Sequence, residues 1–148
     1  QIREIVGELE IPVIANGDVT SAKSAEACLG KTGAAGLMIG RGAIGRPTIF
    51  HEIKRDLGWS KSPPPWGVED EKVARHWCWR RYLELSEELY HGRLNKNLKR
   101  HAVSFTKGLP GASTMRVELH SERDQKKLGE KVSDYLLNLT SESEVAAA

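Results

Sequence analysis

Residues 11–50 read IPVIANGDVTSAKSAEACLGKTGAAGLMIGRGAIGRPTIF and decide the fold of the first part of the chain. Two short apolar runs, Ile11–Ala15 and Gly36–Ile39, each end in a polar turn that contains glycine. A segment with helical spacing, Ala22–Lys31, lies between them. This order predicts an α/β fold built on a β-α-β unit, which brings both turns to the carboxyl ends of neighbouring parallel strands. Phosphates and cofactors bind at such strand ends in α/β proteins.

Length, charge and cysteine content limit the classes of protein to which the chain can belong. The chain has 148 residues, the length of one ordinary domain, and its net charge of +2 is too small to indicate a partner by itself. No apolar run approaches the roughly 20 residues that cross a bilayer. Cys28 and Cys78 have no metal-ligand partner at a recognisable spacing, which indicates reduced cysteines in a cytoplasmic protein. The chain begins with Gln1, and we expect it to be part of a longer protein.

A proline-rich segment divides the chain into two parts of different character. Three consecutive prolines in Trp59–Gly67 (WSKSPPPWG) exclude a helix and favour an extended linker. Apolar residues beyond the linker recur at helical spacing and predict helices over Glu69–Tyr90, Arg93–Leu109 and Ala112–Leu119, and a last helix that ends near Leu139. The predicted organisation is an α/β domain over 1–58, a linker over 59–67, a helical domain over 68–140 and a flexible tail over 141–148.

Four tryptophans lie in or near the linker, and the sequence pattern assigns a place to three of them. We expect Trp59 and Trp66 to pack between the two domains. Trp77 is expected in the core of the helical domain, whereas Trp79 has no predicted place. The stripe of the first long helix that is expected to face this core contains Ala74, Trp77, Cys78, Tyr82, Leu85 and Leu89.

The two glycine turns have the composition of a phosphate-binding site. Gly17 in the first turn, and Gly40 and Gly42 in the second, allow close approach of the backbone and positive φ, so that several N–H groups converge on one anion. Arg41 adds a guanidinium that grips phosphate oxygens, and a helix starting within Ala43–Phe50 would add its dipole. The alternative is that the glycines only make tight turns. Two adjacent turns, one with an arginine between its glycines, favour phosphate binding.

Asp18 follows Gly17 in the first turn and has a charge of the wrong sign for a phosphate site. Its carboxylate would repel a phosphate toward which it pointed. We therefore expect Asp18 to cap the following helix or to contact hydroxyl groups of a cofactor. Thr20 and Ser21 are further candidates for that cap, because their hydroxyl groups accept hydrogen bonds from the first turn of a helix.

The second predicted helix of the helical domain has a cationic side and an apolar side. At about 100° per residue, its cations fall within a sector of roughly 60°: Arg93, Lys96, Arg100 and Lys107. The opposite side holds apolar residues: Leu94, Leu98, Ala102 and Phe105. A regular row of cations on a helix suits a phosphate backbone, and the alternative is a solvated helix face. His101 lies between the two sides, where a histidine bonded to the backbone is the structural interpretation.

Several motifs of the chain occur together in one known family. The stretch IPVIANGDVTS…TGAAGLMIGRGAIGRPTIF resembles the end of the barrel in tRNA-dihydrouridine synthases, FMN-dependent barrel enzymes that reduce uridine in tRNA. The order and spacing of that family's C-terminal helical domain recur in Asn97–His101 (NLKRH), Phe105–Gly108 (FTKG), Gly111-Ala112 and Met115-Arg116. The chain departs from the family pattern at Met115, which replaces Phe, and at Ser104, which replaces a frequent Trp; both positions look like packing.

The resemblance implies an α/β plus all-α protein: the last βα units of a TIM (β/α)8 barrel, followed by a C-terminal helical bundle. It implies that the first turn lies against the phosphate and ribityl part of FMN through Asn16, Gly17 and Asp18. It implies that the second turn binds the phosphate through Gly40, Arg41 and Gly42. The helical domain is then expected to bind tRNA through Arg93, Lys96, Arg100, His101, Lys107 and Arg116.

The resemblance also implies a reaction that needs a proton donor, and no residue of this chain matches that donor. In the family NADPH reduces FMN, the flavin passes hydride to uracil, and a cysteine from an earlier barrel loop protonates the base. Neither Cys28 nor Cys78 matches that cysteine motif. We expect the chain alone to be inactive and to self-associate through unpaired strand edges. The alternatives are another FMN- or phosphate-binding barrel oxidoreductase, and a non-catalytic RNA-binding module over Glu69–Leu139.

Overall fold

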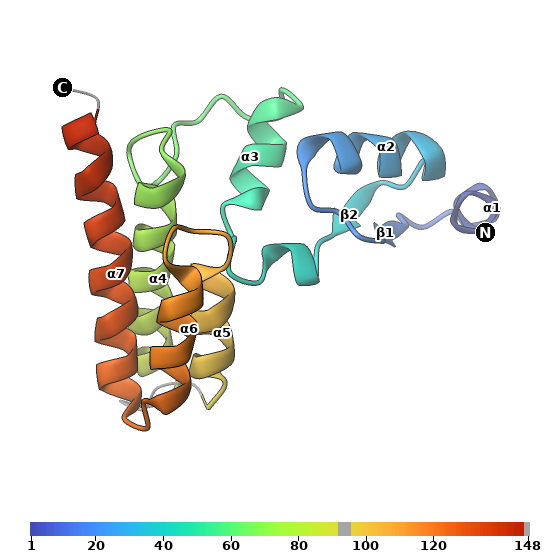
Figure 1. Cartoon of the computed structure of the whole chain (residues 1–148). Helices are drawn as coiled ribbons and strands as arrows, with labels where there is room; N and C mark the ends of the chain where they lie inside the picture. Colours follow the sequence, from blue (N-terminus) through green and yellow to red (C-terminus); the bar gives the residue numbers. More distant parts are fainter. Residues whose placement is uncertain (92–95, 147–148) are drawn as a thin grey trace. The chain divides into compact units, whose positions relative to one another are not determined.

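A computed structural model describes residues 1–91 and 96–146 of the chain, with side chains described up to residue 140 (Figure 1). The chain divides into two compact units, residues 1–62 and residues 63–148. This division falls inside the proline-rich segment 59–67 that the sequence marks as a linker.

The first unit is a small α/β structure built on two parallel strands. Strands β1 (Ile14–Asn16) and β2 (Gly36–Met38) pair in parallel, with Ile14 opposite Gly36 and Asn16 opposite Met38. Between them runs the crossover helix α2 (Ala22–Thr32). The other elements of the unit are α1 (Ile2–Glu8), the single 3₁₀ turn η1 (Arg41–Ala43) and α3 (Ile49–Asp56). The predicted β-α-β unit is therefore present.

Local sequence signals determine where α2 begins and ends. The Ser21 hydroxyl accepts a hydrogen bond from the Ser24 N–H at 3.2 Å, and the Ser24 hydroxyl accepts one from the Ser21 N–H at 3.0 Å. This reciprocal pair satisfies two N–H groups that have no partner within the helix. Gly33 ends α2 with φ of 69° and donates to the Leu29 carbonyl at 2.7 Å. The prediction of a cap at Ser21 is confirmed, and a cap at Asp18 was wrong.

The two strands are shorter and more exposed than the sequence predicts. Both apolar runs were expected to be strands covered on both faces. Ala15 is buried, but Ile14 is 56% exposed and Met38 is 52% exposed. Helices α2 and α3 contact each other, and α2 contacts both strands, so the apolar cluster of the unit lies on one face of the sheet. It consists of Val19, Ala25, Ile49 and Ile53. The prediction that both faces of the two strands are buried was therefore wrong for this unit.

The second unit is a bundle of four described helices. They are α4 (Glu71–Leu89), α5 (Leu98–Thr106), α6 (Ala112–Ser121) and α7 (Gln125–Ala146). Helix α7 lies along α4 and α5, and α5 packs against α6 (Figure 1). The largest fully buried apolar side chains of the unit are those of Trp79, Leu98, Leu119 and Leu136. The predicted helical domain is present, with two changes of length.

Helix α5 is shorter than predicted and α7 is longer. The structure begins α5 at Leu98 and ends it at Thr106, so Lys96 and Lys107 lie outside it. Asn97 precedes α5, and Lys107 follows it with an extended backbone. At the other end of the unit, α7 continues to Ala146, through most of the segment that was expected to be a flexible tail.

The side of α4 that faces the bundle differs from the predicted stripe. Trp79 is fully buried, whereas Trp77 is 39% exposed and Leu89 is 71% exposed. The Trp79 indole N–H donates to the Gly129 carbonyl on α7 at 3.1 Å. A Cβ on Gly129 would lie 3.3 Å from the Leu83 side chain, so this glycine allows α4 to come close. The assignment of Trp77 to the core was wrong, because a glycine on a distant helix selects Trp79 instead.

The linker tryptophans have different environments. Trp66 packs against the core cluster of the second unit, and its ring centroid lies 6.0 Å from that of Trp77. Trp59 is 58% exposed. Across residues 1–91 and 96–146, no helix has both the length and the apolar character needed to cross a membrane.

Candidate phosphate site and nucleic-acid surface

The two glycine turns lie side by side because the strands before them are paired in parallel. Asn16, the last residue of β1, is opposite Met38, the last residue of β2. The chain leaves the sheet at the same edge in both cases, through Gly17-Asp18 and through Gly40-Arg41. A two-strand sheet with this register is sufficient to bring together turns that are 23 residues apart, which is the separation of Asp18 and Arg41.

Gly42 is the point of closest approach between the two turns. A Cβ on Gly42 would lie 2.3 Å from the Val19 carbonyl oxygen, so any other residue would force the backbone to move. Gly17 and Gly40 are different, because a Cβ on either would meet no atom within 4 Å. Positive φ was expected at the glycines of these turns, but it occurs at Asp18, with φ of 40°, and at none of Gly17, Gly40 and Gly42. The glycines therefore keep space free and do not supply a left-handed backbone.

Arg41 and Asp18 form an ion pair across the two turns. An Arg41 Nη2 group donates to Asp18 Oδ1 at 2.6 Å, and the two side chains are 87% and 85% exposed. The pair gives Asp18 a contact that the sequence did not predict, because its carboxylate is the partner of the Arg41 guanidinium. An exposed pair of this kind contributes about 0–1 kcal/mol to stability. The guanidinium can therefore exchange the carboxylate for another anion at little cost.

The two turns enclose one open pocket of about 640 Å³. All six residues that the resemblance assigns to FMN line it, together with two that the sequence reasoning missed: Asn16, Gly17, Asp18, Val19, Thr20, Gly40, Arg41 and Gly42. Val19 and Thr20 follow Asp18 directly, so their place was implied by the turn itself. The second turn itself is the single 3₁₀ turn η1, in which the Ala43 N–H donates to the Gly40 carbonyl at 3.0 Å. The helix expected to start within Ala43–Phe50 is α3, which starts at Ile49.

Most of the predicted RNA-binding side chains are exposed, but they do not form one helical stripe. Arg100 lies on the exposed side of α5, opposite the buried Leu98 and Ala102. Lys96 precedes this helix, Lys107 follows it, and Arg116 is exposed on α6. Arg93 lies outside the described residues. The predicted row of cations on a single helix was therefore wrong, because α5 is only nine residues long.

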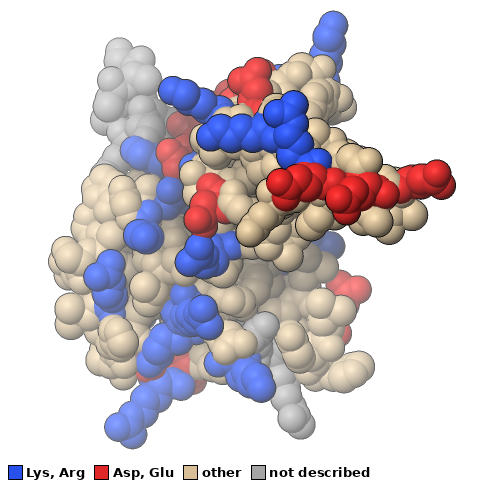
Figure 2. Space-filling model, turned by 90° about the vertical axis from the view of Figure 1, so that its right-hand side faces the viewer, with Lys and Arg blue, Asp and Glu red and all other residues tan. Residues whose placement is uncertain are grey.

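Cations nevertheless gather on this side of the bundle. Figure 2 shows Lys and Arg side chains over the lower part of the molecule, where α5 and α6 lie in Figure 1, with few Asp or Glu among them. Lys99 of α5 is a further cation close to α6, because its Nζ donates to the His120 carbonyl at 3.0 Å. The sequence contained Lys99 in the motif NLKRH, but the helical-wheel argument left it out. The cations therefore come from two helices, α5 and α6, and from the turns at the ends of α5.

The His101 side chain lies at the edge of the bundle, in contact with Tyr82. The two rings meet edge to face at 5.2 Å between centroids, and His101 Nδ1 lies 2.8 Å from the Tyr82 hydroxyl. A bond to the backbone was expected, so this interpretation was wrong. Burial lowers the pKa of His101, and the neighbouring charge of Arg100 lowers it further. The histidine is therefore neutral at neutral pH and does not add to the cationic surface.

Arg75 of α4 supports the turn that carries Lys107. One Arg75 Nη1 group donates to the Lys107 carbonyl at 2.8 Å and to the Phe105 carbonyl at 3.3 Å. Its Nη2 group also pairs with Glu71 at 2.6 Å. Carbonyls at a helix end have no partner within the helix, so this guanidinium satisfies the end of α5 and fixes the following turn. Nothing local in the sequence of residues 98–107 points to Arg75, which is why it was missed.

Comparison with known proteins identifies the chain. The family described as dihydrouridine synthase (Dus) matches residues 1–140. The chain belongs to this family. The match covers the whole first unit and the second unit up to residue 140, so the two glycine turns and the helical bundle are parts of one family pattern.

Individual relatives agree with the family match. A probable tRNA-dihydrouridine synthase from Rickettsia conorii is 31% identical over 137 residues, which are 90% of this chain and 40% of that protein. A probable tRNA-dihydrouridine synthase 1 from Synechocystis is 34% identical over 120 residues, 80% of this chain and 32% of the relative. tRNA-dihydrouridine synthase B from Escherichia coli is 48% identical over 71 residues, 48% of this chain and 22% of the relative. The chain thus spans well under half the length of these relatives.

The two cysteines of the chain lie away from the pocket. Cys78 is buried in the bundle on α4, and burial raises the pKa of its thiol to about 11. Cys28 lies on α2 and packs against the apolar cluster of the first unit. Neither residue lines the pocket between the two turns. In the part of the chain that the structure describes, no three His, Cys, Asp or Glu side chains are grouped so as to hold a metal ion.

Proposed function

We propose that this chain is part of an FMN-dependent tRNA-dihydrouridine synthase, in which NADPH is the reductant of the intact enzyme. In this proposal the first unit is the end of a TIM (β/α)8 barrel and holds the phosphate of FMN, and the helical unit contacts tRNA. The observation that carries the proposal is the convergence of all six candidate residues, including Arg41, on one pocket in a chain of this family.

The pocket has the chemistry that a phosphate monoester needs. A guanidinium, that of Arg41, faces it, and Gly17 and Gly40 leave room for an anion to approach the backbone closely. In the described residues, the N–H groups of Arg41 and Gly42 donate to no backbone carbonyl and so are free to bind anion oxygens. When bound, FMN would supply hydride transfer to uracil.

Asp18 and Asn16 would bind the part of the cofactor beyond the phosphate. On phosphate binding, the Arg41 guanidinium would leave Asp18 for the more highly charged anion. The freed carboxylate would then accept hydrogen bonds from ribityl hydroxyl groups, and the Asn16 amide would add a second polar contact. Gly42 would keep the two turns at the spacing that this arrangement requires.

The acid that protonates the base would come from residues outside this chain. A thiol with a pKa of about 11 in an apolar core, as at Cys78, is not suited to donate a proton to a substrate. Cys28 lies on the crossover helix and not at the pocket. We therefore expect that the 148 residues alone form no dihydrouridine.

The helical unit would bind the tRNA backbone with cations from two helices in contact, α5 and α6, and from the turns at the ends of α5. Lys96, Arg100, Lys107 and Arg116 are exposed and lie on or next to α5 and α6. Each phosphate contact adds a salt-dependent and sequence-independent increment of affinity. Arg75 would position Lys107 through the bonds to the turn after α5.

A comparison of FMN with riboflavin tests the flavin site. Binding of both ligands to the 148-residue chain is followed by NMR through the amide signals of Gly40 and Gly42. We expect FMN to shift these signals at lower concentration than riboflavin, because riboflavin lacks the phosphate. Arg41→Ala should reduce the affinity for FMN to that for riboflavin, whereas Arg3→Ala on α1 should change neither. Equal affinity of the wild-type chain for the two ligands would contradict the phosphate site.

A reconstitution experiment tests the assignment of the reaction. Unmodified tRNA and NADPH are incubated with the 148-residue chain and, separately, with the full-length protein, and dihydrouridine is measured by mass spectrometry. We expect product with the full-length protein alone. Dihydrouridine formed by the isolated chain would overturn the view that the proton donor lies outside it.

A further inference from the structure

The outward side of α4 carries an aromatic and cationic surface that is separate from the cations of α5 and α6. It lines a hollow of about 380 Å³ with the residues Val73, His76, Trp77, Arg80, Arg81 and Glu84, which we call the α4 platform. These residues recur every three or four positions and therefore share one side of the helix. The buried residues Ala74, Cys78 and Trp79 occupy the other side. The platform is thus the solvent side of α4 and not part of the bundle core.

A tryptophan forms the apolar part of the platform and is held in place from behind. Trp77 is 39% exposed, although α4 has a fully buried tryptophan two residues later. The Trp66 ring lies 6.0 Å from the Trp77 ring at an angle of 55°, and Trp66 itself packs against the bundle core. Trp77 is thereby supported on one side and accessible on the other. A supported, accessible aromatic ring is the feature on which unpaired bases stack in proteins that bind single-stranded nucleic acid.

The charges around Trp77 are those of an anion-binding surface. Arg80 is exposed one turn from Trp77, and among the residues that the structure describes it has neither a hydrogen-bonding partner nor an ion-pair partner. Arg81 is paired with Glu84 at 2.9 Å, so its guanidinium already has an anionic partner. Burial lowers the pKa of His76, and Arg80 lowers it further, so His76 adds a neutral ring. One free guanidinium therefore stands beside the exposed tryptophan.

We propose that the α4 platform binds an unpaired nucleotide of RNA, with a base stacked on Trp77 and the adjoining phosphate bound by Arg80. The inference rests on the proposed tRNA function and adds a second contact surface to it. The cations of α5 and α6 would contact the RNA backbone, whereas the α4 platform would bind an unpaired nucleotide. An RNA strand matches both halves of the platform, since each nucleotide offers a flat base and a phosphate one backbone step apart. An acidic protein partner would satisfy Arg80 but would leave the supported Trp77 ring without a stacking partner.

The test of the stacking contact uses the 148-residue chain and unmodified tRNA. Affinity is measured at several salt concentrations for wild type, Trp77→Leu and Trp77→Phe. We expect Trp77→Leu to weaken binding about fivefold or more, with no change in the salt slope, because a stacked base contributes little salt dependence. Trp77→Phe keeps a ring and should recover most of the affinity. Circular dichroism melting of each variant establishes that the bundle is folded.

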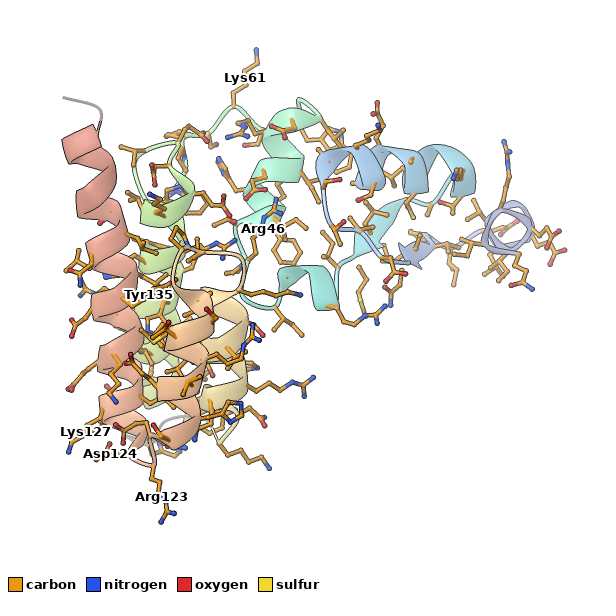
Figure 3. The ribbon with its side chains drawn as sticks, in the orientation of Figure 1. Arg46, Lys61, Arg123, Asp124, Lys127 and Tyr135 are labelled. Carbon is orange, nitrogen blue, oxygen red and sulfur yellow. The ribbon has the colours of Figure 1, made fainter. Side chains whose placement is uncertain are left out.

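The phosphate contact is tested with two charge-matched variants. Arg80→Gln should weaken binding and lower the magnitude of the salt slope by about 0.7–0.9, the value for one lost phosphate contact. Lys127→Gln removes the same charge at the start of α7, where Figure 3 shows Lys127 beside the turn from α6, and should change binding less. Equal losses in Arg80→Gln and Lys127→Gln would mean that only total charge matters and would overturn the contact at Arg80.

The outcomes separate this inference from the proposed function. If the wild-type chain does not bind tRNA, the proposed RNA-binding role of the helical unit fails, and the platform proposal fails with it. If the wild type binds and Trp77→Leu binds equally well, the platform proposal alone is overturned. If Trp77→Leu and Trp77→Phe lose the same affinity while both are folded, an aromatic ring does not restore the contact, and base stacking on Trp77 is overturned.

Discussion

Gly42 is the residue at which the two turns of the candidate phosphate site come closest. In Gly42→Ala the new Cβ would lie 2.3 Å from the Val19 carbonyl oxygen, and one turn must move. We expect a loss of roughly 1–3 kcal/mol in the free energy of unfolding of the first unit, as for other overpacked sites. Urea unfolding followed by amide signals of the first unit measures this loss. Gly17→Ala is the control, since its Cβ meets no atom within 4 Å, and an equal loss there would contradict the close-approach argument.

His101 makes the stability of the helical unit depend on pH. Its pKa is lowered from 6.5 by burial and by Arg100, so the unfolded chain takes up a proton more readily than the folded one. The stability that this provides is complete above pH 6.5 and is lost as pH falls through the lowered pKa. We expect His101→Phe, which keeps an aromatic ring against Tyr82, to flatten the decline of melting temperature below pH 6.5. The pKa of His76 is lowered as well, so His76→Gln should remove a further part of the decline.

The control for this pH dependence is His120→Gln, because His120 is exposed on α6. If His120→Gln flattened the slope of melting temperature against pH as much as His101→Phe, the effect would not belong to the buried histidine. A slope that stays the same in His101→Phe would contradict the buried, neutral state of this histidine.

At the scale of single residues, the sequence predicted which groups line the pocket between the two turns but not how they pair. Glycines and an arginine after two strands are local signals, and the turns form one pocket as expected. The ion pair between Arg41 and Asp18 joins residues 23 positions apart, and its geometry depends on the strand register. That register is fixed by pairing between β1 and β2, which no local pattern specifies. The helix cap expected at Asp18 was therefore wrong, although Asp18 does line the pocket between the turns. Its contact with the hydroxyl groups of a cofactor stays a prediction.

The start of α7 is an element-scale feature that can be tested with two neighbouring residues. The Asp124 carboxylate accepts hydrogen bonds from the Lys126 and Lys127 N–H groups at 2.8 and 3.2 Å, and Figure 3 shows it at the turn between α6 and α7. We expect Asp124→Ala to lower the free energy of unfolding of the helical unit by roughly 0.5–2 kcal/mol. Ser121 is the matched control, because its hydroxyl donates to the Glu118 carbonyl within α6. The free energy of unfolding of both variants is measured by chemical denaturation. An equal loss in Ser121→Ala and Asp124→Ala would contradict the assignment of Asp124 as the cap of α7.

At the scale of elements, helix ends were predicted well where a local cap exists and poorly where packing decides. Ser21 and Gly33 bound α2 as the sequence indicates. The buried side of α4 was predicted only in part: Ala74 and Cys78 are buried as expected, but Trp77 is not. Trp77 and Trp79 are both large aromatic residues, and propensity does not choose between them. The choice is made by the Gly129 carbonyl, which lies 50 residues from Trp79 in the chain. The same error hid the platform around Trp77, since that residue was counted as core.

The two units of the whole molecule differ in how much apolar surface they bury. The core cluster of the first unit has four buried residues, Val19, Ala25, Ile49 and Ile53, around a sheet of two three-residue strands. The cluster of the helical unit has ten buried residues, among them Trp79 and Phe105. Burial of apolar area is the main favourable term in folding, and a two-stranded sheet is marginal by itself. The first unit should therefore open more readily than the bundle.

Hydrogen exchange followed by mass spectrometry measures how readily each segment opens. We expect amides of residues 14–16 and 36–38 to exchange well before those of α4 around Trp79 and of α7 around Val132, because local opening needs less free energy where fewer apolar contacts are lost. Leu136→Ala creates a cavity beside α7 and should speed exchange in α4 and α7 while peptides from the two strands stay as they were. If strand and bundle amides of the wild-type chain exchange together, the chain opens as one cooperative whole. The site between the two turns would then be as rigid as the bundle. In that case an anion added to the chain should slow exchange equally at the strand amides and at the bundle amides. Slower exchange confined to residues 14–42 would instead place the anion at the glycine turns.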